Sequence, residues 1–173
     1  MEYEYHTLDQ HNTKRNNMTY IDSTSRPKPV TCNVVPILGT FSATILGLVF
    51  SVLRTRQLGS TQEEMAAAMR MSVSSWRRIE TGLADISVTE LIAASKILDF
   101  PPSLILNAAS SCENFVSRRS IVVVMGSGSS NKLETILINR DIRSDEHYPI
   151  VYVSGNTLLG LIGENILSFL DSL

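Results

Sequence analysis

Apolar positions along the chain fall into three zones with different spacing. Residues 1–40 are polar, rich in Asn, Thr and Ser, and interrupted by three prolines. They show no sustained period and predict a mostly flexible N-terminal arm. From Ser42 the apolar residues recur at helical spacing, and after Ser110 they gather in short runs rich in β-branched side chains. The chain therefore predicts an arm, a helical zone and a mixed zone, in that order.

The helical zone predicts five short helices, delimited by recognisable start and stop signals. Ser60 or Thr61 is placed to cap the second helix, and Ser87 with Glu90 three residues later forms a capping-box pattern before the fourth. Thr81-Gly82 ends the third helix, and Pro101-Pro102 separates the last two. The predicted ranges are 42 to about 59, 62–69, 72–80, 87–98 and 103–109.

The C-terminal zone predicts a small α+β unit over residues 113–173. Its strand candidates are 121–125, 135–139 and 149–153, and residues 156–170 predict a helix with apolar positions on two sides. The run Gly126-Ser-Gly-Ser-Ser follows the first strand candidate, but no Gly-Lys-Ser/Thr comes after it. We therefore interpret it as a turn or linker in preference to a phosphate-binding loop.

Composition and charge narrow the function classes. Hydrophobic residues make up 43% of the 173 residues, which is enough to form a core. The formal net charge of −2 argues against a wholly basic nucleic-acid coat protein. Charge is uneven, however: residues 41–82 carry five arginines and three glutamates, and this is the only positive stretch.

Signals for secretion, metal binding and catalysis are weak. The first ten residues contain no basic segment followed by an apolar run, and the two cysteines lack metal-ligand spacing, so we expect a cytoplasmic protein. The three histidines are scattered and no Ser/His/Asp set is identifiable, so we expect no metal, no cofactor and no enzymatic activity. Residues 34–53 carry no charge and could span a bilayer by length, but proline, glycine and hydroxyl side chains interrupt them. We therefore expect no membrane association.

The segment Thr61–Gly82, TQEEMAAAMRMSVSSWRRIETG, predicts two helices joined by a tight turn around Arg70-Met71. When two helices cross at a sharp angle, the positions between them must be apolar or small. Met65, Ala66, Met69, Met71, Trp76 and Ile79 meet that requirement. The positions left outside are Gln62, Val73, Ser74, Arg77 and Arg78. Basic and hydrogen-bonding side chains thus gather on the outer face of the second helix.

This block resembles the helix-turn-helix of the lambda-repressor-like family, also called the Cro/repressor or XRE type. The resemblance is carried by Thr61-Gln62, Glu64, Ala66, the Ser72–Ser75 stretch, Ile79-Glu80 and Gly82. It extends to the helices on either side and covers about residues 42–109. It implies a mainly α fold: a five-helix DNA-binding domain over 41–112, followed by the C-terminal unit.

The sequence departs from the family pattern at two places. Arg70 stands at the turn position that the family usually fills with Gly, and a positive φ there costs a non-Gly residue roughly 1 kcal/mol. The turn is therefore either distorted or compensated by a phosphate contact of Arg70. The link before Thr61 is one residue longer than usual. That puts the family's arginine of the first helix at Arg54, where it is expected to form a structural ion pair with Glu80.

The resemblance implies a double-stranded DNA partner. Helix 72–80 would enter the major groove, with Ser74, Ser75, Arg77 and Arg78 reaching base edges. Thr61 and Gln62 would hold phosphate, and Arg54, Arg56 and Arg70 are further phosphate candidates. The DNA-binding set is Thr61, Gln62, Arg70, Ser72, Val73, Ser74, Ser75, Arg77 and Arg78.

The function expected is that of a transcriptional regulator, most simply a repressor. It would bind a two-fold operator as a homodimer, because one module contacts few base pairs. The C-terminal unit is the candidate for dimerisation, for a protein partner or for a small ligand. The alternative is a protein-interaction module, such as an antitoxin or adaptor, whose C-terminal unit binds a partner protein.

Overall fold

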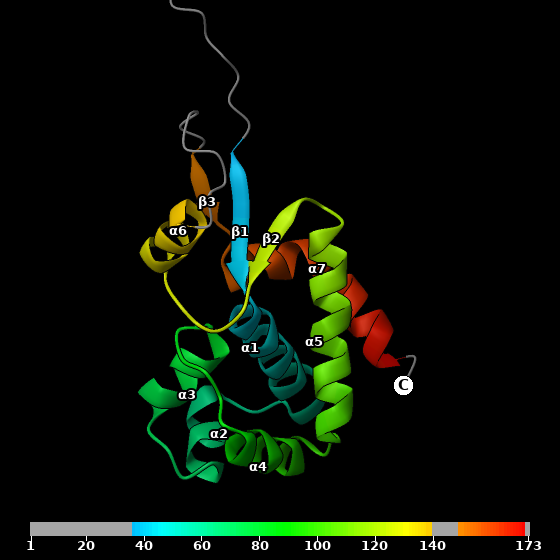
Figure 1. The fold of residues 1–173 in the computed structure, drawn as a ribbon. Coiled ribbons are helices and arrows are strands. Elements are labelled where there is room, and N and C mark those ends of the chain that lie inside the picture. Colours follow the sequence, from blue (N-terminus) through cyan, green and yellow to red (C-terminus); the bar gives the residue numbers. More distant parts are fainter. Residues whose placement is uncertain (1–35, 140–148, 172–173) are drawn as a thin grey trace, which may run out of the picture. The chain divides into compact units, whose positions relative to one another are not determined.

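The computed structural model describes residues 36–139 and 149–171 (Figure 1). These residues form one compact unit that is mainly helical, as the sequence predicts, with one small sheet. The strands are β1 (Ile37–Phe41), β2 (Ile121–Val124) and β3 (Ile150–Tyr152). The helices are α1 (Ser42–Val52), α2 (Gln62–Ala68), α3 (Val73–Glu80), α4 (Val88–Leu98), α5 (Pro102–Ser117), α6 (Ser130–Asn139) and α7 (Gly155–Asp171), with a π-helical turn, η1 (Leu53–Leu58), after α1.

The sheet is parallel and its strand order is β2-β1-β3. β1 is the central strand: Leu38 is in register with Ile121 on one side and with Val151 on the other. The predicted N-terminal arm therefore needs correction at its end, since residues 37–40 belong to β1; residues 1–35 lie outside the described part. β1 is stabilised by partners more than 80 residues further along the chain, a pairing that no local pattern reveals.

The predicted strand at 135–139 is wrong, because these residues are the second half of α6. Leu133 and Leu137 stand four residues apart, lie on one helical face, and are buried against Phe41 and Val124 of the sheet. The approach is close: a side chain at Gly39 would meet Leu133 at 3.0 Å. The strands predicted at 121–125 and 149–153 and the helix at 156–170 are confirmed, with small differences at their ends.

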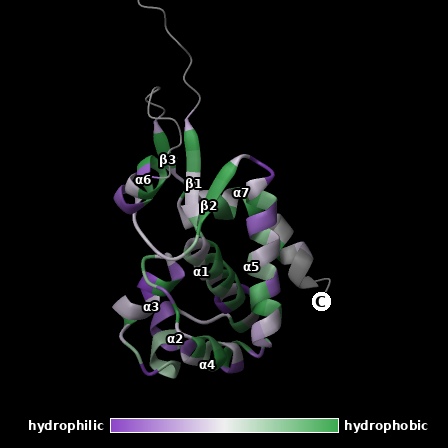
Figure 2. Ribbon diagram, in the orientation of Figure 1, coloured by the Kyte–Doolittle hydropathy of each residue, from purple (hydrophilic) through white to green (hydrophobic). Residues whose placement is uncertain are grey.

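α1 runs through the centre of the helical part and links it to the sheet (Figures 1 and 2). One continuous apolar core joins Ile45 and Trp76 of the helical zone to Ile121 and Leu158 of the C-terminal zone. α5 is longer than the predicted 103–109, because Cys112 and Val116 continue its buried face. The boundary expected between residues 112 and 113 therefore falls inside this helix.

The uncharged stretch 34–53 changes from strand to helix at Ser42, within the part that the structure describes. Of the helices in residues 36–139 and 149–171, none has both the length and the apolar character needed to cross a membrane.

Candidate nucleic-acid interface

Two capped helices, α2 and α3, form the candidate interface. Thr61 caps α2: its hydroxyl accepts from the backbone N–H of Glu64 at 3.2 Å, and its own N–H donates to the Glu64 carboxylate at 2.7 Å. Ser72 caps α3 by accepting from the N–H of Ser75 at 3.0 Å. Thr61 is thus the cap among the two candidates that the sequence left open, and Ser72, the first residue of the predicted helix 72–80, is the cap of α3.

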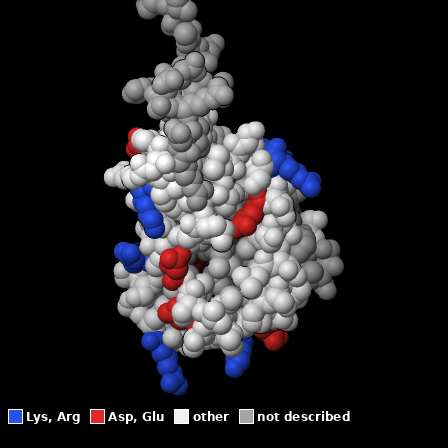
Figure 3. Space-filling model, in the orientation of Figure 1, with Lys and Arg blue, Asp and Glu red and all other residues white. Residues whose placement is uncertain are grey.

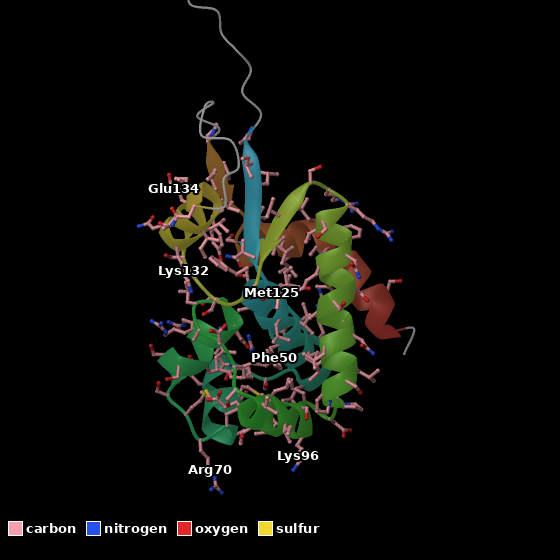
Figure 4. All side chains as sticks on the ribbon, viewed as in Figure 1. Phe50, Arg70, Lys96, Met125, Lys132 and Glu134 are labelled. Atoms are coloured by element: carbon pink, nitrogen blue, oxygen red, sulfur yellow. The ribbon has the colours of Figure 1, made fainter. Side chains whose placement is uncertain are left out.

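Arg70 occupies the turn between these helices in a left-handed conformation, with φ of 56°. The backbone hydrogen bonds around it are regular: its N–H donates to the carbonyl of Ala67, and the N–H of Met71 donates to that of Ala66, both at 3.0 Å. The turn thus keeps its shape and Arg70 bears the conformational cost. Its side chain is exposed and points away from the domain (Figure 4).

One side of α3 is buried in the core and the other side is exposed to solvent. Trp76 is fully buried and its ring lies 5.7 Å from that of Phe50, measured between centroids; Ile79 is also buried. Ser74, Ser75, Arg77 and Arg78 are exposed, and Val73 is half-buried. The helix therefore presents two hydroxyls and two guanidinium groups to solvent from a firmly packed base.

Beneath α3, the carboxylate of Glu80 forms the centre of a buried polar network. Arg54 donates to it from Nε at 2.6 Å and from Nη2 at 3.1 Å, and both side chains are almost inaccessible to solvent. Trp76 Nε1 donates at 2.8 Å and Gln62 Nε2 at 2.6 Å. A buried carboxylate needs such a set of donors, because it has lost its water. The sequence predicted the ion pair of Arg54 with Glu80, but not that Gln62 and Trp76 also donate hydrogen bonds to this carboxylate.

The link before α2 is shaped by η1. The sequence indicates that this link is one residue longer than usual. A π turn commonly accommodates one extra residue in a helix. Gly59, with φ of 62°, ends the turn by donating its N–H to the carbonyl of Arg54. Nη1 of Arg54 in turn donates to the carbonyl of Ser60 at 2.6 Å. Arg54 therefore holds both α3 and the chain that leads into α2.

Gln62 and Thr61, both expected to bind phosphate, form side-chain hydrogen bonds with other residues of α2 and α3, although Thr61 is exposed and Gln62 is half-buried. The Gln62 amide donates to Glu80 while its carbonyl oxygen accepts from Nε of Arg77 at 3.2 Å. Thr61 is occupied by its capping box with Glu64. These two residues thus serve the geometry of α2 and α3, and Gln62 orients Arg77.

The charge on this surface is positive. With Arg54 and Glu80 neutralising each other in the interior, residues 41–82 expose four arginines, Arg56, Arg70, Arg77 and Arg78, against Glu63 and Glu64. In Figure 3, basic side chains project at the left and lower left, where α2 and α3 lie in Figure 1, while acidic atoms lie closer to the middle of the drawn face. Arg78 also donates from Nη2 to the carbonyl of Leu83 at 3.3 Å, which leaves most of its guanidinium donors to solvent.

The C-terminal zone holds the helical part through backbone contacts that the sequence did not reveal. The N–H of Gly128 donates to the carbonyl of Gly82, directly after α3, at 3.1 Å. Gly126 donates to the Ser42 hydroxyl at 3.0 Å and accepts from the N–H of Ala43 at 3.1 Å. Residues 126–129 of the Gly-Ser-Gly-Ser-Ser run therefore form a loop that holds α3 and α1 against the sheet, and the last serine of the run begins α6.

Comparison with known proteins agrees with this geometry. Residues 45–107, from α1 into α5, match the family model of a helix-turn-helix domain. The chain thus contains a helix-turn-helix domain, within the range 42–109 that the sequence indicated. No curated protein and no solved structure matches the chain significantly.

Proposed function

We propose that this protein is a sequence-specific DNA-binding transcriptional regulator, with α3 as its recognition helix. The observation that carries the proposal is the exposed row of Ser74, Arg77 and Arg78 on a helix whose opposite side is fixed by Trp76 and Glu80. Arginine donates two parallel hydrogen bonds to guanine in the major groove, and serine hydroxyls can bond to any base edge. A helix-turn-helix domain presents its second helix to that groove.

The side chains of α3 that we propose to contact the bases are held in place by the domain. This favours sequence-specific DNA binding over binding that depends on charge alone. The hydrogen bond from Arg77 to Gln62 limits the rotamers of a long side chain before DNA arrives, so less conformational entropy is lost on binding. Arg70 and Arg56 lie outside the buried network and are available to phosphates.

We further propose that the regulator acts as a homodimer on a two-fold operator, and that it is a repressor. One α3 helix contacts too few base pairs for useful specificity, whereas two half-sites multiply the discrimination. The C-terminal helix α7 leaves Leu159 and Leu161 more than 40% exposed, which supplies apolar surface for a second copy.

The test is binding of the full chain to labelled duplexes tiled across the DNA upstream of its own gene, at two salt concentrations. We expect tight binding to one tile containing a two-fold repeat, with the logarithm of the affinity falling as the logarithm of salt rises. Arg77→Ala/Arg78→Ala should abolish preference for that tile with little change in melting temperature.

The control is Arg118→Ala/Arg119→Ala, which removes two exposed charges from the turn after α5, together with the contact of the Arg119 guanidinium with the Phe115 ring. It should retain the tile preference, because these residues lie outside α2 and α3. Unchanged binding by the Arg77/Arg78 variant would contradict the assignment of α3. Absence of duplex binding even at low salt, together with a stoichiometric protein partner, would instead support a protein-interaction module.

A further inference from the structure

A cavity of about 430 Å³ opens between α1, the segment joining α3 to α4, α5 and the loop after β2. Its walls are largely apolar and include Leu46, Ile86, Leu106 and Met125. Two acidic side chains also line it: Asp85 from the α3–α4 segment and Glu113 from α5. Its volume is in the usual range for sites that bind small organic molecules.

The cavity has negative charge and no compensating cation in its lining. Neither Asp85 nor Glu113 forms an ion pair within residues 36–139 and 149–171, and no Lys or Arg lines the cavity there. Glu113 is half-buried, and burial raises the pKa of its carboxyl group because the charged form loses water. In Figure 3, acidic atoms lie on either side of the hollow in the middle of the face that is drawn.

We propose that this cavity binds a small organic cation with an apolar body. The ammonium end would lie between Asp85 and Glu113, and the apolar end would cover Leu106 and Met125, of which Met125 is 79% exposed. A cation placed there replaces the water that Glu113 has lost, whereas an anion of equal size meets two like charges.

The cavity lies close to the segments that hold the end of α3, so a bound ligand could influence the position of that helix. Asp85 lies five residues after Glu80, and Gly126 belongs to the same loop as Gly128, which donates to the carbonyl of Gly82. A bound cation would therefore contact both segments that hold the end of α3. The binding proposal itself does not depend on DNA binding, so the two can fail separately.

The test uses the full chain and three probes of similar shape and different charge: phenylbutylammonium, phenylbutanol and phenylbutyrate. Isothermal titration at neutral pH should show one site for the ammonium, weaker binding of the alcohol and none of the carboxylate. Glu113→Gln should weaken ammonium binding about tenfold while leaving binding of the alcohol unchanged.

Two further variants keep the result interpretable. Asp85→Asn should weaken ammonium binding, and by less, since Asp85 is exposed. Glu134→Gln, on the exposed side of α6 and outside the cavity (Figure 4), should leave it unchanged. Equal binding of all three probes, or ammonium binding that survives both Glu113→Gln and Asp85→Asn, would overturn the proposal. Each variant's melting temperature shows whether it is folded.

Discussion

Gln62 and Arg77, fifteen residues apart, are joined by a hydrogen bond of 3.2 Å from Nε of the guanidinium to Oε1 of the amide. The same Gln62 donates to buried Glu80 at 2.6 Å. The network beneath α3 thus extends to its surface, and an exposed arginine is oriented by a buried carboxylate through one glutamine. This relation places Gln62 among the residues that position the reading side chains.

Gln62→Met should therefore weaken specific DNA binding more than non-specific binding. Methionine matches the length of glutamine but cannot bond to Arg77, so the guanidinium regains rotamers that binding must then restrict. Glu80 keeps its bonds from Arg54 and Trp76, so the loss of stability should be about 1 kcal/mol. Titrations with operator and random duplexes, beside thermal unfolding, measure both effects. An equal loss for the two duplexes would show that Gln62 acts on phosphate affinity alone.

Arg70→Gly should raise thermal stability and lower DNA affinity. Glycine adopts the left-handed conformation at φ of 56° without the cost of roughly 1 kcal/mol that arginine bears. If Arg70 contacts phosphate, the variant should also show a salt dependence smaller by about one charge. Arg70→Lys is the control, since it keeps the charge and the strain. A less stable glycine variant would contradict the account of the turn.

The helical zone was predictable because its signals are local. The capping box of Ser87 with Glu90 depends on residues three positions apart, and the structure confirms it. For α2 the sequence leaves the cap open between Ser60 and Thr61, and the structure shows that it is Thr61, paired with Glu64. The family resemblance added the pairing of Arg54 with Glu80, which are 26 residues apart. Local patterns alone would not have joined them.

The sheet was less predictable because its contacts are distant in sequence. The sequence places residues 37–40 of β1 in the arm, because prolines interrupt the polar segment that they end; the partners of β1 lie far along the chain, in β2 and β3. The strand expected at 135–139 rested on β-branched Thr135, Ile136 and Ile138, yet the spacing of Leu133 and Leu137 determined a helix. The family resemblance implies a phosphate contact for Gln62, whereas its hydrogen bond to Glu80 is visible only in three dimensions.

Two helical glycines make a matched pair for the packing of α1 on α3. A Cβ on Gly47 would lie 2.5 Å from the carbonyl oxygens of Ile79 and Glu80, whereas one on Gly160 would meet nothing within 4 Å. Gly47→Ala should thus destabilise the protein by a few kcal/mol, because backbone must move. Gly160→Ala should stabilise it by about 0.5–1 kcal/mol, through helix propensity alone. Chemical denaturation gives the free energy of unfolding of both variants. An unchanged value for Gly47→Ala would contradict the close packing of α1 on α3.

Acid should weaken the fold partly through the capping box of α4. The Glu90 carboxylate accepts from the N–H of Ser87 at 2.8 Å and from its hydroxyl at 2.7 Å, and these bonds hold the pKa of Glu90 below its ordinary value of 4.5. A pKa lowered by folding adds stability above about pH 4.5, and that stability is lost as the pH falls through the lowered value. Glu90→Gln should therefore lower the melting temperature at pH 7 and make no difference well below pH 4.

Glu134→Gln, which removes one negative charge from the exposed side of α6, separates this effect from net charge. A gap between wild type and Glu90→Gln that stays constant from pH 7 to strong acid would mean that the ionised carboxylate contributes nothing to the cap.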